Sequence, residues 1–198
     1  MTDPKTIAFY DKSAAQYDSC LNSGAASTAL SDFLALLPNG ADVLDLGCGP
    51  ACASVQMRAL GFRPDPVDAS KGMVDLANKT HDIGARRLSF AELDMVGAYD
   101  GVWANFSLLH APRADLPRHF AAVATALRDG GVFHVAMKTG AGEKRDRIER
   151  LYSFVTVEEL QSLLQDAGFA VIAIREGEDV GMAGTNDPFV TMRARKIG

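Results

Sequence analysis

Residues 43–51 read VLDLGCGPA, and this stretch decides the fold of the chain. The apolar residues predict a strand, and Gly47 and Gly49 predict a tight turn before a helix from about Ala51 to Leu60. Glycines in such a turn adopt backbone angles that side chains forbid, and they let a ligand lie against the main chain. The N-terminus of the helix adds free N–H groups and the positive end of the helix dipole. We therefore expect a ligand site at the end of the first strand.

The rest of the chain alternates predicted strands and helices, after an N-terminal region at residues 5–37 with helical spacing. Strands are expected at residues 42–46, 62–68, 88–90, 101–107, 132–137, 169–175 and 189–195. Among the helices between them, one has Ser70 as its predicted N-cap, and another has a capping box formed by Thr156 and Glu159. This alternation predicts an α/β fold with a parallel sheet covered by helices on both faces. Ligands of such sheets bind beyond the carboxyl ends of the strands.

Composition narrows the class of protein further. The chain has 198 residues and a net charge of −5, which fits one globular domain and argues against a nucleic-acid partner. No apolar run reaches the roughly 20 residues that span a bilayer, and no leader peptide is recognisable, so we expect a cytoplasmic location without membrane contact. The three cysteines (Cys20, Cys48 and Cys52) predict neither a disulfide framework nor a metal site.

Two kinds of adenosine-containing ligand fit the glycine turn. A dinucleotide site normally has a third glycine where this chain has Cys52, and it must accommodate two phosphates. Asp68, at the end of the second predicted strand, can hold a ribose in either case. Asp45 and Asp94 make the site acidic, which suits a ligand that carries an ammonium and a sulfonium.

Several segments together resemble the class I S-adenosylmethionine-dependent methyltransferases. They are Asp45–Ala51, Val67–Met73, Leu93–Met95, Tyr99–Trp103 and Leu127–Phe133, with Ala51 where the family usually has a third glycine. The resemblance implies a single-domain, doubly wound, Rossmann-like sheet of seven mostly parallel strands with an antiparallel strand near the C-terminus. It also implies an N-terminal helical lid at residues 1–40, followed by the S-adenosylmethionine-binding domain at residues 41–198.

The resemblance further implies which residues bind S-adenosylmethionine. Asp45 supports the ammonium group, Gly47 and Gly49 let the methionyl part pass, and Asp68 holds the ribose hydroxyls. The remaining expected contacts surround the adenine, the methionyl group or the lid: Ala69, Met73, Asp94, Met95, Asn105 and Tyr17. Glu92, in the same loop, is an alternative to Asp94 as the acidic residue. Met73 can instead be a core residue that does not contact the cofactor.

Three residues are candidates for the side of the site that faces the methyl acceptor. His110 follows the fourth predicted strand, where the family's acceptor pocket lies, and its imidazole has a suitable pKa for a general base. Lys138 and Arg145 belong to a basic stretch at residues 138–150, which we interpret as a solvated loop or as a contact for an anionic or polar acceptor. His134, inside an apolar strand, is expected to be a core residue.

The sequence thus predicts a methyltransferase that transfers a methyl group from S-adenosylmethionine to a small-molecule acceptor. A soft nucleophile such as sulfur needs no base in this reaction, whereas a hydroxyl usually does. Two alternatives stay open, namely an NAD(P)-dependent oxidoreductase and a non-catalytic S-adenosylmethionine-binding regulator. The acceptor, the methylated atom and the oligomeric state are not fixed by the sequence.

Overall fold

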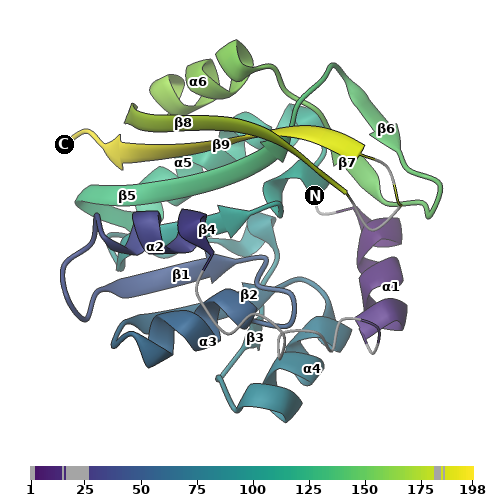
Figure 1. Cartoon of the computed structure of the whole chain (residues 1–198), viewed down its shortest axis with the longest axis horizontal. Helices are drawn as coiled ribbons and strands as arrows, with labels where there is room; N and C mark the ends of the chain where they lie inside the picture. The colour runs from purple at the N-terminus through teal and green to yellow at the C-terminus, as the bar shows by residue number, and fades with distance from the viewer. Residues whose placement is uncertain (1–2, 15, 17–26, 181–183, 185) are drawn as a thin grey trace.

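A seven-stranded sheet forms the centre of the protein in the computed structural model, which describes residues 3–14, 16, 27–180, 184 and 186–198 (Figure 1). Its strands follow the order β3-β2-β1-β4-β5-β9-β8. They are β1 Asp42–Leu46, β2 Arg63–Asp68, β3 Arg86–Arg87, β4 Tyr99–Asn105, β5 Leu127–Lys138, β8 Phe169–Val180 and β9 Asn186–Lys196. The first five are parallel, and β9 runs antiparallel to both β5 and β8. The predicted α/β fold is confirmed.

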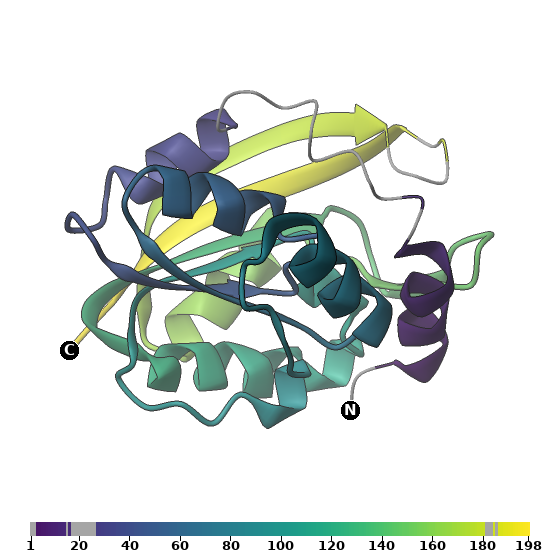
Figure 2. The same ribbon diagram turned by 90° about the horizontal axis from the view of Figure 1, so that it is seen from below.

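Helices cover both faces of this sheet (Figure 2). On one face, α2 (Thr28–Leu34) and α3 (Cys52–Ala59) bury apolar side chains around Trp103, and α4 (Lys71–His81) packs against α3. On the other, α5 (Leu116–Ala126) and α6 (Val157–Asp166) enclose the larger apolar core. The predicted caps are confirmed: Ser70 accepts from the Met73 N–H, and Thr156 and Glu159 form a capping box. No helix in the described part of the chain has the length and apolarity needed to cross a membrane.

The third strand differs from its prediction. Residues 88–90 were expected to be extended, but β3 is limited to two residues and Phe90–Glu92 forms a short 3₁₀ helix, η2. Its start is fixed by Glu92, whose side chain accepts from the backbone N–H and the hydroxyl of Ser89. These local hydrogen bonds stabilise the 3₁₀ helix in place of an extended conformation, so Phe90 is not part of a strand.

Pro64 and Pro66 lie in β2 although this strand is in the interior of the sheet. The Arg63 N–H donates toward the β1 side, to the Ala41 carbonyl, so alternate positions such as Pro64 face away from β1. There β3 pairs only with Val67 and Asp68. The missing proline donors therefore face a stretch without a partner strand, and no ladder hydrogen bond is lost.

The polar stretch after β5 contains a hairpin that the sequence did not predict. It consists of β6 (Glu143–Arg145) and β7 (Leu151–Ser153), and it lies beside α1 (Pro4–Ser13) at one end of the sheet (Figure 1). The predicted N-terminal lid contains two helices that occupy different places. Helix α2 packs on one face of the sheet, whereas α1 lies across the end of the sheet. The domain boundary at residue 40 stays a prediction.

Candidate functional site

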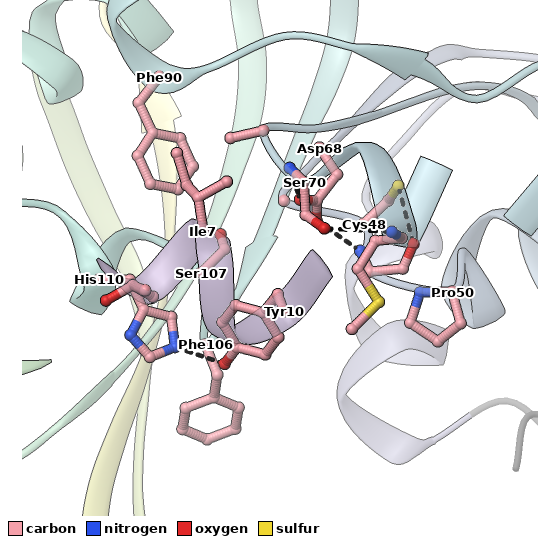
Figure 3. Close-up of a pocket in the computed structure, with 15 residues that line it drawn as sticks. Ile7, Tyr10, Cys48, Pro50, Asp68, Ser70, Phe90, Phe106, Ser107 and His110 are labelled. Carbon is pink, nitrogen blue, oxygen red and sulfur yellow. Dashed lines mark hydrogen bonds between the residues drawn. The ribbon is translucent and has the colours of Figure 1, made fainter. Parts of the chain in front are cut away.

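Two adjoining cavities lie at the carboxyl ends of β1, β2 and β4. The first, of about 240 Å³, extends from the end of β2 to α1 and His110 (Figure 3). The second, of about 380 Å³, lies between α2, α3 and the end of β4. Gly47 and Cys48 line both cavities, so the glycine turn forms the boundary between them. An elongated ligand that crosses this turn can occupy both.

The glycine turn is shaped by contacts that allow no side chain at Gly47. This residue has φ +77°, and an added Cβ would lie 2.4 Å from the Cβ of Ser107. At Gly49, with φ +54°, an added Cβ would meet no atom within 4 Å, so the backbone faces open space. Ala51 keeps the left-handed conformation, with φ 63°, that a glycine would adopt more easily. The tight turn is confirmed and its backbone is accessible at Gly49, while contact of Gly47 and Gly49 with a ligand stays a prediction.

Asp68 is oriented by backbone donors on both sides of the first cavity. The Gly49 N–H donates to its Oδ2 at 2.9 Å, and the Ser70 N–H donates to its Oδ1 at 2.8 Å. Burial nevertheless raises the pKa of Asp68 above its usual value. Each carboxylate oxygen retains a further lone pair, so the pair of oxygens can accept two hydroxyl donors from a ligand such as a ribose.

Asp45 lines the second cavity and is almost fully buried, with 3% of its surface exposed. Ser54 donates its hydroxyl to Oδ2 at 2.7 Å. Burial raises the pKa of Asp45 to about 7, and the nearby Asp68 adds to this effect. A buried carboxyl group of this kind gains most from a cationic ligand, which restores its charged form.

Of the four residues expected to contact the adenine, two line the first cavity and two do not. Ala69 and Met73 line the first cavity. Asp94 is exposed after η2, and neither it nor the half-buried Met95 is among the lining residues. Phe90 takes that side of the cavity instead, so its surface there is aromatic and apolar rather than acidic.

Asn105, at the end of β4, lines the second cavity together with Trp103. Its Oδ1 lies 3.1 Å from Nε2 of His134, which is buried in β5. Burial lowers the pKa of His134 to about 3, so its imidazole is neutral. Asn105 thus lines the second cavity and contacts a neutral imidazole, while its contact with the methionyl group stays a prediction.

His110 lines the first cavity and belongs to the 3₁₀ helix η3 (Leu108–His110). Its Nδ1 lies 2.7 Å from the Leu151 carbonyl oxygen, which can only accept, so Nδ1 carries the proton. Its Nε2 therefore accepts from the Tyr10 hydroxyl at 2.8 Å (Figure 3). Burial lowers the pKa of His110 to about 4, which keeps the imidazole neutral near pH 7.

Arg150 contacts the hydrogen-bonded pair of Tyr10 and His110 through the Tyr10 hydroxyl. Its Nη1 donates to the Tyr10 hydroxyl oxygen at 3.2 Å, and its Nη2 pairs with Asp146 at 2.8 Å. The guanidinium is buried and lies over the rings of Phe9 and Tyr152. Tyr10 is thus held between a cation and a neutral imidazole at the border of the cavity.

Lys138 and Arg145 are engaged in ion pairs and do not line either cavity. Lys138 pairs with Asp187 of β9 at 2.5 Å and lies over the ring of Tyr152. Arg145 pairs with Asp3 at 2.6 Å and thereby ties the β6–β7 hairpin to the start of α1. Direct contact of either side chain with an acceptor stays a prediction.

The remaining predictions concern Tyr17 and the cysteines. Tyr17 and Cys20 lie outside the described residues. Cys52 is disulfide-bonded, a single bond that the sequence did not predict, whereas Cys48 is a free thiol whose pKa is raised by burial. Within the described ranges, no group of three or more His, Cys, Asp or Glu side chains is placed to hold a metal ion.

Sequence reasoning missed several residues that line the first cavity. They come from α1, from η2 and from the loop after β4: Thr6, Ile7, Tyr10, Phe90, Phe106 and Ser107. The three from α1 recur at positions 6, 7 and 10, the spacing of one helix face. That pattern was available in the sequence, but nothing indicated what the face covers.

Comparisons with known proteins identify the family and the fold of the chain. A family model described as a methyltransferase domain matches residues 22–174, and the comparison with curated proteins gives no match. Among solved structures, the Burkholderia thailandensis 1,6-didemethyltoxoflavin-N1-methyltransferase, with bound 1,6-didemethyltoxoflavin and S-adenosylhomocysteine, aligns with TM-score 0.78 and 24% identity, over 98% of this chain and 88% of that one. A Methanosarcina mazei S-adenosylmethionine-dependent methyltransferase aligns with TM-score 0.75 and 16% identity, over 87% and 98%. The [4+2]-cyclase SpnF aligns with TM-score 0.75 and 17% identity, over 100% and 98%. These structures share the fold.

Proposed function

We propose that this chain, which belongs to the methyltransferase-domain family, transfers the methyl group of S-adenosylmethionine to a small-molecule acceptor. The observation that carries the proposal is a pair of carboxyl groups on either side of the glycine turn, the buried Asp45 and the half-buried Asp68. Asp68 faces the cavity between β2 and α1, and Asp45 faces the cavity beside Asn105. The sulfonium of the cofactor would lie between them, near Gly47.

In this arrangement each part of the cofactor has a matching surface. The ribose hydroxyls donate to Asp68, and the adenine packs beside Ala69, Met73 and Phe90. The methionyl ammonium is attracted to Asp45 in the second cavity. A dinucleotide is disfavoured, because its phosphates would enter a space bordered by two acidic side chains, Asp45 and Asp68, whose charged forms repel phosphate.

The chemistry of transfer is a displacement at the methyl carbon. The acceptor atom forms a bond to this carbon while the bond from carbon to sulfur breaks and the sulfonium becomes a neutral thioether. Alignment of the two reactants supplies much of the rate, with effective molarities of order 10⁵ M or more in favourable cases. The apolar side chains of Ile7, Phe90 and Phe106 around the first cavity exclude water and favour a small, largely apolar acceptor. The Burkholderia enzyme, an N1-methyltransferase with 1,6-didemethyltoxoflavin bound, is an example of a small-molecule methyltransferase with this fold.

Calorimetric titration with S-adenosylhomocysteine and with NADH tests the cofactor. We expect saturable binding of S-adenosylhomocysteine only, and binding of NADH alone would overturn the proposal. Transfer of label from methyl-labelled S-adenosylmethionine to a panel of small amines, ring nitrogens, hydroxyls and thiols then tests catalysis. Tight cofactor binding without transfer to any of them would favour the non-catalytic alternative.

For acceptors that must lose a proton, the proposal gives His110 the role of general base through Tyr10. As the acceptor atom bonds to the methyl carbon, its proton passes to the Tyr10 oxygen and the Tyr10 proton passes to Nε2 of His110. The imidazolium then returns this proton to solvent. Because the sulfonium has become a neutral thioether, the imidazolium does not add to the net charge that the site carried before transfer.

Replacement of His110 by Gln tests this role. For a hydroxyl or amine acceptor we expect kcat to fall about 100-fold, with the dissociation constant of S-adenosylhomocysteine within about twofold of the wild type. Tyr10→Phe should give a similar loss. At saturating cofactor, the acidic limb of kcat/KM for the acceptor should lie near pH 4, the pKa of His110, rather than near pH 6.5. An unchanged kcat in both variants would exclude the relay.

A further inference from the structure

Three aromatic rings pack together beside the second cavity, which Trp103 lines. The imidazole of His134 lies parallel to the indole of Trp103, with ring centroids 3.8 Å apart and an interplanar angle of 14°. Phe33 of α2 closes the group, with its ring against both Trp103 and His134. Trp103 and His134 are 4% and 1% exposed, so neither ring can reorient without disturbing the core.

One polar contact leaves this stack, and its direction is fixed by the protonation of His134. The neutral imidazole has one N–H, and Nδ1 is buried without a hydrogen-bond partner. If Nδ1 carried the proton, a buried donor would be left unpaired, which is rare in native proteins and costs free energy. The proton therefore resides on Nε2 and is donated to Oδ1 of Asn105, 3.1 Å away.

The charge around His134 favours the same neutral state. Its register partner on β9 is Arg193, whose positive charge adds to burial in lowering the pKa of His134. Arg193 itself pairs with Asp32 of α2 at 3.2 Å. His134 therefore acts as a hydrogen-bond donor whose charge does not change near neutral pH.

We infer that His134 is a positioning residue for the cofactor: by holding Oδ1 of Asn105, it turns the NH₂ group of Asn105 into the second cavity, where it donates to the carboxylate of the methionyl group. This inference rests on the proposed function. An amide without this contact can rotate and present its oxygen, which repels a carboxylate. With Asp45 in the same cavity, the oriented amide provides a donor for the carboxylate and Asp45 provides an anion for the ammonium.

Two ligands isolate the effect, because they share the adenosine part. S-adenosylhomocysteine carries the amino-acid group, whereas 5′-methylthioadenosine lacks it. Calorimetry on the full chain should compare wild type with His134→Phe, which keeps an aromatic ring on Trp103 but removes the N–H, and with Asn105→Ala. His134→Gln, which retains an N–H donor, is the conservative variant.

We expect His134→Phe to weaken S-adenosylhomocysteine about threefold to tenfold and to leave 5′-methylthioadenosine within about twofold of the wild type. His134→Gln should recover part of the loss. The double variant with Asn105→Ala should bind no more weakly than Asn105→Ala alone, because both changes remove the same contact. Melting temperatures measured beside each titration show whether the variants fold.

Equal weakening of both ligands by His134→Phe would assign His134 a purely structural role and overturn the inference, and so would an unchanged affinity for S-adenosylhomocysteine. If His134→Phe does not fold, His134→Leu, which also removes the N–H, takes its place and is judged by the same ratio of the two ligands. A wild-type protein that binds neither ligand would instead refute the proposed function, so the two failures are distinguishable.

Discussion

The floor and the roof of the first cavity are built in different ways. The floor consists of residues 47–50 and 68–73, whose geometry depends on backbone donors and on glycines close in sequence. The roof consists of α1 with His110 and Arg150, held by side chains far apart in the chain: Tyr10 bonds His110 across 100 residues, and Arg145 pairs with Asp3 across 142. A floor made by the backbone is fixed before ligand arrives, whereas a roof held by side-chain contacts can be loosened one contact at a time. Floor variants should therefore change cofactor affinity, and roof variants should change how the acceptor is used.

The largest effect is expected at Gly47. Gly47→Ala places a Cβ 2.4 Å from the Cβ of Ser107 on a backbone with φ +77°, so the turn must shift out of the ligand's path. We expect affinity for S-adenosylhomocysteine to fall more than 100-fold, measured by calorimetry. The matched control is Gly84→Ala, with φ +73° but no atom within 4 Å of the added Cβ. If both variants lose affinity equally, backbone strain rather than collision is responsible and the floor is less specific than proposed.

Asp68 should come next. Asp68→Asn replaces one carboxylate oxygen by an NH₂ group, which must then face the N–H of either Gly49 or Ser70. We expect S-adenosylhomocysteine to bind about 30-fold more weakly, because a ribose acceptor is lost and two donors are opposed.

Asp94→Asn is the comparison for Asp68→Asn, since Asp94 is exposed and outside both cavities. We expect a change within about twofold. A loss as large as that of Asp68→Asn would establish the adenine contact that the sequence resemblance implies, and it would require the loop at η2 to rearrange on binding.

The same contrast explains what the sequence could predict. The strand, the glycine turn and the Ser70 cap depend on neighbouring residues, and their positions agree with the pattern within a few residues. The position of Phe90 depended on a capping interaction at Ser89 that outcompeted a strand, and a periodicity argument does not weigh the two. His110 is paired with Tyr10 of α1 and Arg145 with Asp3, the N-cap of α1, and no local pattern encodes which distant segment covers a cavity. Pairing between side chains far apart in the chain is therefore the part of the site that the sequence did not predict.

Asp45 sharpens the comparison through pH. Its pKa is raised to about 7 in the ligand-free protein, so below pH 7 the carboxyl is largely protonated and must lose a proton to attract an ammonium. Affinity for S-adenosylhomocysteine should rise with pH, by up to about tenfold per unit below pH 7, and level off above it. Calorimetry in buffers of different ionisation enthalpy should detect proton release on binding.

Two controls identify the group that titrates. Asp45→Asn should abolish the slope, and 5′-methylthioadenosine should show none because it has no ammonium. His110 and His134 titrate near pH 4 and pH 3, outside this range. A slope that survives in Asp45→Asn would assign the proton to another group. In the ligand-free protein the same pKa predicts the opposite trend for stability: the contribution of Asp45 is present below pH 4 and is lost as pH rises to 7.

The smallest effect is expected at the roof's outermost tie, the pair of Arg145 and Asp3. Arg145 is partly exposed, so its loss should have little effect on stability. Arg145→Gln releases the start of α1 but leaves the floor intact, so KM for the acceptor should rise about twofold to threefold while the dissociation constant of S-adenosylhomocysteine stays unchanged. Lys138→Gln is the matched change of one positive charge, and it breaks a pair with Asp187 that does not involve α1. A rise in KM with Arg145→Gln alone would mean that Arg145 acts through the position of α1; an equal rise with both would mean that positive charge itself attracts the acceptor.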